Sequence, residues 1–274
     1  MLSPLKWTGS KRYIAKEIIS YFPKKIDTYY EPFCGSASIL IELLQSDIKV
    51  KKYIISDINR DCIVTLKLVS HIPATLCSAY EGLWEYMKAL KTIKEKQEYY
   101  NLIRKTFNEE KSIAAFFLFL NRTCYNGLIR YNSKGEFNTS YHVNRDGIEP
   151  KKLLKILWDF ADLCRGKDIE FETKNYADIN SVGENDFLYL DPPYSDTDKM
   201  YQNSFNKEEF YSWLGKQKCK YALSYNGKSS KQDNTQDIPK ELFKQHLYMK
   251  KSKSSFDRLN KNDTIMEESL YLNY

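Results

Sequence analysis

Short apolar runs followed by turn residues mark the N-terminal part of the chain. Residues 27–33 (DTYYEPF) predict a strand that enters a turn, and residues 37–44 predict a helix with Ser36 as its N-cap. A second apolar strand at residues 53–56 stops at Asp57. This order of strand, turn, helix and strand is typical of the opening of a doubly wound α/β sheet.

The middle of the chain has a different pattern. Residues 63–119 are helical in character, and residues 121–150 contain Asn-Gly, Lys-Gly and Asp-Gly pairs that mark turns. A further helix is predicted at residues 151–163. Strand patterns then return at 168–173, 187–190, 220–224 and 268–272.

This order predicts two domains. Residues 1–62 and 163–274 are expected to form an α/β domain, which is interrupted by an inserted, mainly helical module at residues 63–162.

Composition narrows the class of protein. The chain has 274 residues, of which 42% are hydrophobic, and its longest apolar run, residues 113–120, is far too short to span a bilayer. The N-terminus has no apolar signal region. The chain has six cysteines, none of them in a CxxC pair, and only three histidines. We expect a reduced, cytoplasmic protein of the size of an enzyme, without a membrane segment, metal site or disulfide scaffold.

Positive charge is concentrated in one segment. The net charge is +6, and residues 121–155 carry seven basic and three acidic side chains, a local charge of +4. Such a segment, rich also in Asn, Ser, Thr and Tyr, suits contacts with nucleic-acid phosphates. A solvated surface loop is the alternative interpretation.

The tetrapeptide Asp191-Pro192-Pro193-Tyr194 directly follows the apolar strand FLYL. Sites in open α/β sheets form at the carboxyl ends of strands, and two prolines make the loop stiff. The carboxylate and a proline carbonyl then form a rigid pair of acceptors beside an aromatic ring. They can draw an exocyclic amino group of a nucleobase towards sp³ geometry and release its lone pair for attack. A polyproline-like surface turn is the alternative.

A second constellation lies at the first turn from strand to helix. Glu31-Pro-Phe-Cys-Gly-Ser36 places a small residue where a cofactor can approach the backbone, and Asp57 follows about 20 residues later, where an acid can bind ribose hydroxyls. Gly35 stands alone, so this is not a GxGxxG fingerprint. Asp57 could instead cap the helix that starts near Asn59.

Six segments in a fixed order connect these motifs to a known family. They are residues 5–11 (LKWTGSK), 31–35 (EPFCG), 56–59 (SDIN), 120–130 (LNRTCYNGLIR), 134–138 (KGEFN) and 191–194 (DPPY). The chain resembles the Dam-type, D12-class S-adenosylmethionine-dependent DNA adenine-N6 methyltransferases, and residues 250–272 resemble the family's closing hairpin. The resemblance implies a Rossmann-like methyltransferase sheet with an inserted, mainly helical target-recognition domain.

The resemblance also implies the cofactor S-adenosyl-L-methionine and the residues around it. Trp7 would lie near the methionine end, Lys11 would tether nearby groups, and Asp57 would bind the ribose. The implied cofactor-binding residues are Trp7, Lys11, Glu31, Phe33, Gly35, Asp57, Tyr176, Asp178 and Asp191, with Tyr176 and Asp178 at the adenine. The implied catalytic residues are Asp191, Pro192, Pro193 and Tyr194.

Residues 125–130 match the family's DNA-reading hairpin. Arg130 is a candidate reader of guanine through a bidentate fork, and Tyr125 and Asn126 can fill the stack left by a flipped adenine. The expected DNA-binding residues are Arg122, Tyr125, Asn126, Leu128, Arg130, Asn132, Lys134, Asn138 and Arg145.

The target sequence stays open. Many family members have Val-Pro-Phe-Gly after the segment KGEFN, whereas this chain has residues 139–147 (TSYHVNRDG). GATC, CATG and longer sites are therefore all compatible with the sequence.

We expect an enzyme that methylates N6 of adenine within a short specific sequence of double-stranded DNA. It would act as a monomer, either as the modification enzyme of a restriction-modification system whose endonuclease acts separately, or as an orphan methyltransferase. An N4-cytosine methyltransferase is an alternative, but such enzymes more often carry Ser in place of Asp191. An RNA adenine methyltransferase and a catalytically inactive DNA-binding relative are the others.

Overall fold

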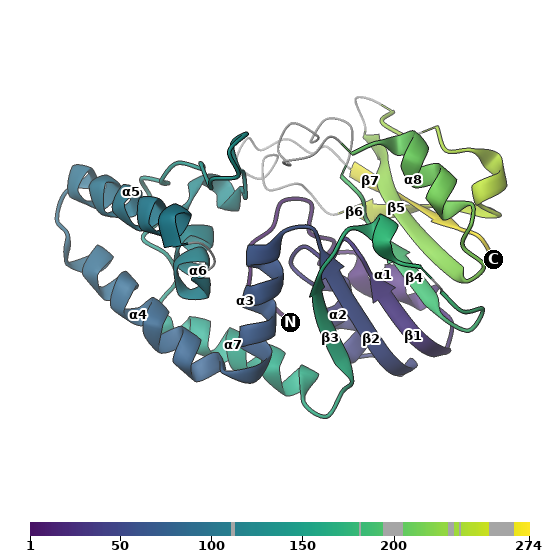
Figure 1. Ribbon diagram of the computed structural model, residues 1–274, viewed down its shortest axis with the longest axis horizontal. Coiled ribbons are helices and arrows are strands. Elements are labelled where there is room, and N and C mark those ends of the chain that lie inside the picture. The colour runs from purple at the N-terminus through teal and green to yellow at the C-terminus, as the bar shows by residue number, and fades with distance from the viewer. Residues whose placement is uncertain (111–112, 181, 194–204, 230–232, 236, 252–265) are drawn as a thin grey trace.

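A seven-stranded mixed sheet forms the centre of the computed structural model, which describes residues 1–274 except 111–112, 181, 194–204, 230–232, 236 and 252–265. The strand order is β3-β2-β1-β4-β5-β7-β6, and β7 runs antiparallel to both of its neighbours while the other pairs are parallel (Figure 1). The strands are β1 Lys25–Glu31, β2 Lys49–Asp57, β3 Ile169–Thr173, β4 Phe187–Leu190, β5 Lys220–Ser229, β6 Gln245–Lys251 and β7 Met266–Leu272.

The strand order creates a topological switch point between β1 and β4. From β1 the chain proceeds outwards through β2 to β3, and it then returns to β4 and proceeds in the other direction. Connections therefore leave β1 and β4 on opposite sides, which opens a crevice at their carboxyl ends. Glu31, Asp57 and Asp191 stand at or directly after the ends of β1, β2 and β4, so three carboxyl groups share this edge.

Helices cover the sheet and extend away from it. α3 packs against β2 and β3, and α7 packs against α2, α3 and α4 (Figure 1). The α-helices are α1 Ala15–Ser20, α2 Ser38–Leu44, α3 Arg60–His71, α4 Pro73–Ala89, α5 Ile93–Glu110, α6 Ala114–Thr123, α7 Pro150–Cys164 and α8 Lys207–Leu214. Single-turn 3₁₀ helices are η1 Tyr125–Gly127, η2 Tyr176–Asp178 and η4 Lys240–Leu242.

The most apolar segment of the chain is α6, at the centre of the helical part. It contacts α3, α4 and α5, and Phe117, Leu118, Phe119 and Leu120 are all fully buried. A helix that is apolar on every side is expected where neighbours enclose it. Within the described residues, no single helix is both long and apolar enough to cross a membrane; α3 and α4 reach that test only together, as a pair bent by 119°.

The predicted domain boundaries fall inside two helices. Position 62/63 lies within α3, and position 162/163 lies within α7. Because α3 contacts both the sheet and the helical part, it connects the two regions continuously. The division of the chain into residues 1–62 with 163–274 and residues 63–162 stays a prediction.

The predicted strands at 27–33, 53–56, 168–173, 187–190, 220–224 and 268–272 correspond to β1, β2, β3, β4, β5 and β7. The prediction of Ser36 as N-cap was wrong. The cap position of α2 is Ala37, which has a left-handed φ of 55° and makes no side-chain cap bond. Ser36 turns instead towards the N-terminal segment, where its hydroxyl lies 3.2 Å from Ser10 Oγ. Two further elements, α1 and α8, and the edge strand β6 were not predicted.

Candidate active site and nucleic-acid interface

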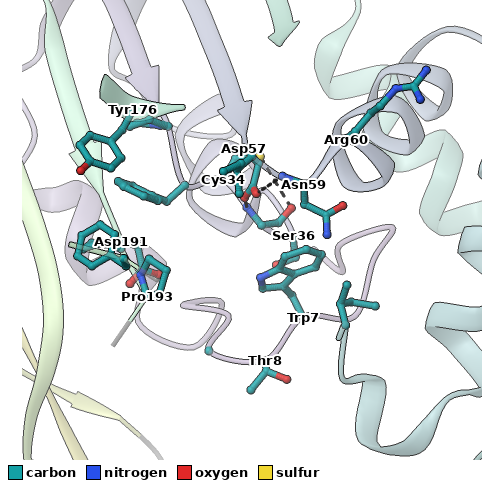
Figure 2. Close-up of a pocket in the computed structure, with 18 of the residues that line it drawn as sticks. Trp7, Thr8, Cys34, Ser36, Asp57, Asn59, Arg60, Tyr176, Asp191 and Pro193 are labelled. Carbon is teal, nitrogen blue, oxygen red and sulfur yellow. Dashed lines mark hydrogen bonds between the residues drawn. The ribbon is translucent and has the colours of Figure 1, made fainter. Parts of the chain in front are cut away.

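A cavity of about 540 Å³ lies at the carboxyl ends of β1, β2 and β4. Eight of the nine predicted cofactor residues line it, namely Trp7, Lys11, Glu31, Phe33, Gly35, Asp57, Tyr176 and Asp191. In Figure 2, Asp57 and Asn59 lie between Tyr176 and Asp191 on one side and Arg60 on the other, and Trp7 lies beside Ser36. Asp178 is exposed and lies outside the lining, so the structure does not bring it to the other eight.

The turn after β1 requires glycine at position 35. Gly35 has a φ of +45°, and a Cβ atom there would lie 2.7 Å from Trp7 Nε1. The Cys62 thiol donates to the Gly35 carbonyl at 2.8 Å, while the Gly35 N–H donates to Asp57 Oδ2 at 2.9 Å. The turn is thus held from β2, from α3 and by the Trp7 ring.

Asp57 is a buried carboxylate that organises the cavity wall. It accepts N–H bonds from Gly35 and Asn59, each at 2.9 Å. Burial raises the pKa of Asp57 to about 6, although the backbone N–H groups of Asn59, Gly35 and Ile58 oppose the shift. The helix α3 is capped by Asn59, whose side chain accepts from the Cys62 N–H at 2.9 Å. The alternative that Asp57 caps α3 is therefore wrong, and its carboxylate faces the cavity.

Glu31 is the most deeply buried carboxyl group of the cavity. The Tyr29 hydroxyl donates to its Oε2 at 2.8 Å. Burial raises the pKa of Glu31 to about 8, and the nearby Asp191 and Asp57 add to the shift. Glu31 is therefore mostly protonated at neutral pH, and a neutral acid can donate a hydrogen bond as well as accept one.

Asp191, directly after β4, is held by a buried ammonium group. Lys11 Nζ lies 2.8 Å from Asp191 Oδ1 and 3.7 Å from Glu268 Oε2, and the Lys11 side chain is only 2% exposed. Burial lowers the pKa of Lys11, but Asp191 and Glu268 outweigh that effect and raise it. Lys11 therefore stays charged and fixes the orientation of the Asp191 carboxylate.

The sequence did not single out Glu268. The residue lies in β7, 257 positions after Lys11, and 4% of its surface is exposed. In the sequence, Glu268 was visible only as an acidic residue at the start of a predicted strand. The folded sheet shows that its side chain is buried and faces Lys11.

The two prolines after Asp191 also belong to the cavity. Pro192 is buried, and both Pro192 and Pro193 line the space beside Asp191. Tyr194 lies outside the described residues, so its predicted stacking role stays a prediction.

Aromatic rings form one wall of the cavity. The rings of Phe33 and Tyr176 lie 5.4 Å apart, and Tyr176 meets Trp213 edge-on at 5.2 Å. Tyr176 is positioned by η2, whose first turn is capped by the Asn175 side chain through the Ala177 N–H. This wall offers aromatic faces and edges to a planar ring.

The predicted DNA-reading segment begins with the 3₁₀ turn η1, which presents two side chains to solvent. Tyr125 is 50% exposed and its ring stacks on His142 at 5.4 Å and 21°. Asn126 is also exposed and has a left-handed φ of 53°. The sequence Tyr125-Asn-Gly127 thus forms a sharp turn that displays two side chains.

The remaining hairpin residues fall into three groups. Arg130 is exposed, and its Nε donates to Asn138 Oδ1 at 2.8 Å. Asn132 serves the turn itself, because its Oδ1 accepts from the N–H groups of Lys134 and Glu136 at 2.9 and 3.0 Å. Leu128 and Lys134 line the cavity.

Arg122 does not occupy the position that was predicted for it. It is 7% exposed, and its guanidinium donates to the carbonyl groups of Ser3, at 3.2 Å, and Pro4. The prediction of a DNA contact at Arg122 is therefore wrong for this conformation, because the N-terminal segment covers the side chain.

Lys6, which the sequence did not single out, lies in the same segment close to Arg145. Burial, together with the cations Arg145 and Arg122, lowers the pKa of Lys6 to about 8. Arg145 itself is half-buried. Positive charge therefore gathers where the N-terminal segment meets the hairpin.

Comparison with known proteins agrees with this geometry. The sequence model of the D12 class N6 adenine-specific DNA methyltransferases matches residues 7–266. The Type II methyltransferase M.MjaIII of Methanocaldococcus jannaschii is 36% identical over 223 residues, which are 75% of this chain and 74% of that protein.

Two further relatives carry similar names. The DNA adenine methylase of Haemophilus influenzae is 32% identical over 199 residues, 70% of this chain and 63% of that protein. The DNA N-6-adenine-methyltransferase of Escherichia phage P1 is 32% identical over 200 residues, 70% of this chain and 24% of that protein. Because the family match includes the cavity, the Asp191 loop and the hairpin, the chain belongs to the D12 class of N6 adenine-specific DNA methyltransferases.

Proposed function

We propose that this adenine methyltransferase uses S-adenosyl-L-methionine to methylate N6 of adenine within a short specific sequence of double-stranded DNA. The observation that carries the proposal is the fixed Asp191 carboxylate, held by Lys11 at 2.8 Å beside a cavity that also contains Asp57. Asp191 binds the reacting amino group, and Asp57 binds the cofactor.

The cavity suits this cofactor in size and in chemistry. A volume of about 540 Å³ is within the range of small-molecule sites, about 300–1,000 Å³. Asp57 offers a carboxylate to the ribose hydroxyls, and the wall of Phe33 and Tyr176 offers stacking to the adenine ring. When bound, S-adenosyl-L-methionine supplies an electrophilic methyl group on a sulfonium ion.

Asp191 and Pro192 activate the amino group. The lone pair of adenine N6 is delocalised into the ring, so the group is a poor nucleophile. The Asp191 carboxylate and the Pro192 carbonyl accept hydrogen bonds from the two N–H groups of adenine N6. These bonds favour the geometry in which the lone pair points at the methyl carbon. With the cofactor bound, N6 would take the methyl group as the S–C bond breaks, and the Asp191 carboxylate would accept the surplus N6 proton. Positioning and electrostatics supply the rate without a covalent enzyme intermediate.

The hairpin supports a duplex substrate. An adenine inside a duplex reaches the cavity only after it leaves the stack, which costs a few kcal/mol. Tyr125 and Asn126 are exposed in the turn η1 and suit the vacated position. Arg130 suits a guanine edge in the major groove.

The biological setting is proposed from the relatives. M.MjaIII is named a Type II methyltransferase, which favours a modification enzyme that protects DNA from a separate endonuclease. The H. influenzae relative is named a DNA adenine methylase. We propose that the enzyme acts as a monomer in either setting.

The test is incubation with unmethylated duplex DNA and isotopically labelled S-adenosyl-L-methionine. Nucleoside mass spectrometry then identifies the labelled base, and sequencing that detects modified bases maps the target. N6-methyladenine at one recurring sequence is the expected result. Label on cytosine, label only on RNA, or a protein that does not bind the cofactor would each overturn the proposal.

A further inference from the structure

Tyr131 connects the DNA-reading hairpin to the start of α3. Its hydroxyl donates to Asp61 Oδ2 at 2.6 Å and accepts from Asn59 Nδ2 at 3.3 Å. Burial raises the pKa of Tyr131 far above its ordinary value, and Asp61 raises it further, so the hydroxyl keeps its proton and remains a donor. A residue of the helical part thus binds two side chains at the edge of the sheet.

The same bonds continue to the cofactor turn. The Asn59 N–H donates to Asp57 Oδ1 at 2.9 Å, and Asp57 Oδ2 accepts from the Gly35 N–H at 2.9 Å. Asn59 also caps α3 through the Cys62 N–H. Four hydrogen-bonded groups therefore form a continuous path from Tyr131 to the turn after β1.

The hairpin end of this path is the neighbour of the proposed base reader. Tyr131 pairs with Phe137 across the hairpin, and successive residues of a strand point to opposite faces. Arg130 is accordingly exposed on one face, whereas Tyr131 lines the cavity from the other. A shift of the backbone that seats Arg130 on DNA must also move the Tyr131 hydroxyl.

A second attachment keeps the hairpin from moving independently. Asn108 of α5 exchanges two bonds with the Phe137 backbone, at 2.8 and 3.1 Å. The rings of Phe107 and Tyr131 both meet Phe137 edge-on. The hairpin is therefore fixed on its α5 side, and Tyr131 sets its distance from the cofactor turn.

We propose that Tyr131, whose hydroxyl is held by Asp61, is a positioning residue that couples DNA binding to cofactor binding through Asn59 and Asp57. The inference rests on the proposed function, because it requires the cofactor ribose at Asp57 and DNA at the hairpin. The ligand that binds first bears the entropy cost of ordering the path. The second ligand then binds with a smaller entropy cost, so each ligand strengthens the binding of the other.

The coupling is measured as a ratio of affinities. Calorimetry gives the affinity for S-adenosylhomocysteine, which cannot react, with and without a saturating duplex that carries the mapped target. The parent should bind it at least about five-fold more tightly with the duplex, the lower end of ordinary coupling. Tyr131→Phe keeps the ring and loses the hydroxyl, and its ratio should fall to within about two-fold of one.

Tyr141→Phe is the matched control. The Tyr141 hydroxyl donates to Asp146 Oδ1 at 2.8 Å, a buried tyrosine-aspartate bond of the same module that does not reach the cofactor turn. Its ratio should equal that of the parent, although both variants lose a similar bond. Equal ratios in the parent and Tyr131→Phe would overturn the inference, as would an equal loss in the two variants or a parent ratio of one.

A second variant covers the case in which Tyr131→Phe folds poorly. Asp61→Ala removes the acceptor and leaves Tyr131 in place, and its ratio should fall as well. In the double variant the ratio should fall no further, because both changes remove the same anchored Tyr131 hydroxyl from the path. Additive losses would overturn the inference. A protein that binds cofactor and methylates DNA while the ratio stays unchanged refutes the coupling alone, whereas a failure to methylate DNA refutes the proposed function.

Discussion

Lys11 and Asp191 illustrate how much of the chemistry depends on single buried charges. The ammonium is 2% exposed and lies 2.8 Å from the carboxylate. A charge at such depth needs a partner, because desolvation otherwise favours its neutral form. Asp191 therefore serves both the stability of the protein and the proposed reaction, and a test must separate these effects.

Replacing Asp191 should abolish methylation while cofactor binding persists. Asp191→Ala removes an acceptor on N6 and should slow the reaction about 100-fold or more. Asp191→Asn keeps the size of the side chain and separates lost charge from lost packing. Single-turnover rates, cofactor titration and thermal unfolding are the measurements, with the exposed Asp47→Ala as control. A variant that retains more than about a tenth of the parent rate would contradict the role.

Glu31 should make the stability of the protein depend on pH. Its pKa is about 8 in the folded state against an ordinary 4.5, so the folded state binds more protons between these values. Glu31 therefore contributes a loss of stability to the parent as pH rises through this window, and Glu31→Gln lacks this contribution. Relative to that of the parent, the free energy of unfolding of Glu31→Gln should rise by up to about 4 kcal/mol between pH 5 and pH 8. Denaturant unfolding at both pH values measures the difference, and a gain by the parent instead would refute it.

Single residues also mark where sequence reasoning reaches its limit. The pattern of Asp57 after a strand predicted its position at the cavity, which the structure shows. Arg122 was wrongly placed on the DNA surface, because its partners are the carbonyl groups of Ser3 and Pro4, more than a hundred positions away. Backbone acceptors leave no trace in the identity of a side chain, so no local pattern could have identified them.

At the scale of elements, the turn between β1 and α2 has a strict geometry. Gly35 combines a positive φ with a close approach of Trp7. The interaction of this turn with Asp57 transfers any distortion to the cofactor site. The turn therefore tolerates less change than a turn of similar length on the surface.

Gly35→Ala should damage cofactor binding and stability together. The strained conformation alone costs about 1–3 kcal/mol, and Trp7 must also move. Gly82→Ala is the control, because Gly82 lies within α4 and a Cβ atom there meets nothing within 4 Å. That change should stabilise the protein slightly, since alanine favours helices over glycine. Thermal unfolding with and without cofactor compares the two, and equal behaviour would contradict the role of the turn.

Elements with a strong pattern were predicted, and those held by tertiary contacts were not. β4 is a buried apolar run and was predicted with correct bounds. α1 and α8 have only six and eight residues, so their stability comes from packing rather than from propensity. β6 (QHLYMKK) is an edge strand with polar and basic residues, which is usual for an edge and resembles a loop in sequence.

At the scale of the whole molecule, the N-terminal segment fastens the helical part to the sheet. The Asn121 side chain forms two bonds with the Lys6 backbone, at 2.8 and 2.7 Å, and Ser3 Oγ donates to the Ser36 carbonyl at 2.6 Å. Arg122 adds its bonds to the same segment. Positive charge near Lys6 and Arg145 then has a fixed position relative to the cavity.

Substitutions at two arginines of this module should therefore affect different properties, DNA binding in one case and stability in the other. Arg130→Ala should weaken binding of the target duplex by about 1–3 kcal/mol with unchanged unfolding temperature, because the side chain is exposed. Arg122→Met should lower the unfolding temperature, because the carbonyl groups of Ser3 and Pro4 lose their donor. Fluorescence anisotropy with specific and random duplexes, alongside calorimetric melting, distinguishes them. The reverse pattern would refute both assignments.

The pairing of Lys11 with Glu268 has a consequence for the folding of the protein during its synthesis on the ribosome. The two residues are separated by 257 positions, and β7 joins the sheet between two strands that precede it in the chain. Synthesis delivers the N-terminal segment first, and contacts of such long range are slow to form. Until β7 inserts, Lys11 lacks one of its two carboxylates, and β5 and β6 lack the neighbour that joins them. The nascent chain therefore completes its catalytic centre late, after the helices α3 to α7 have emerged.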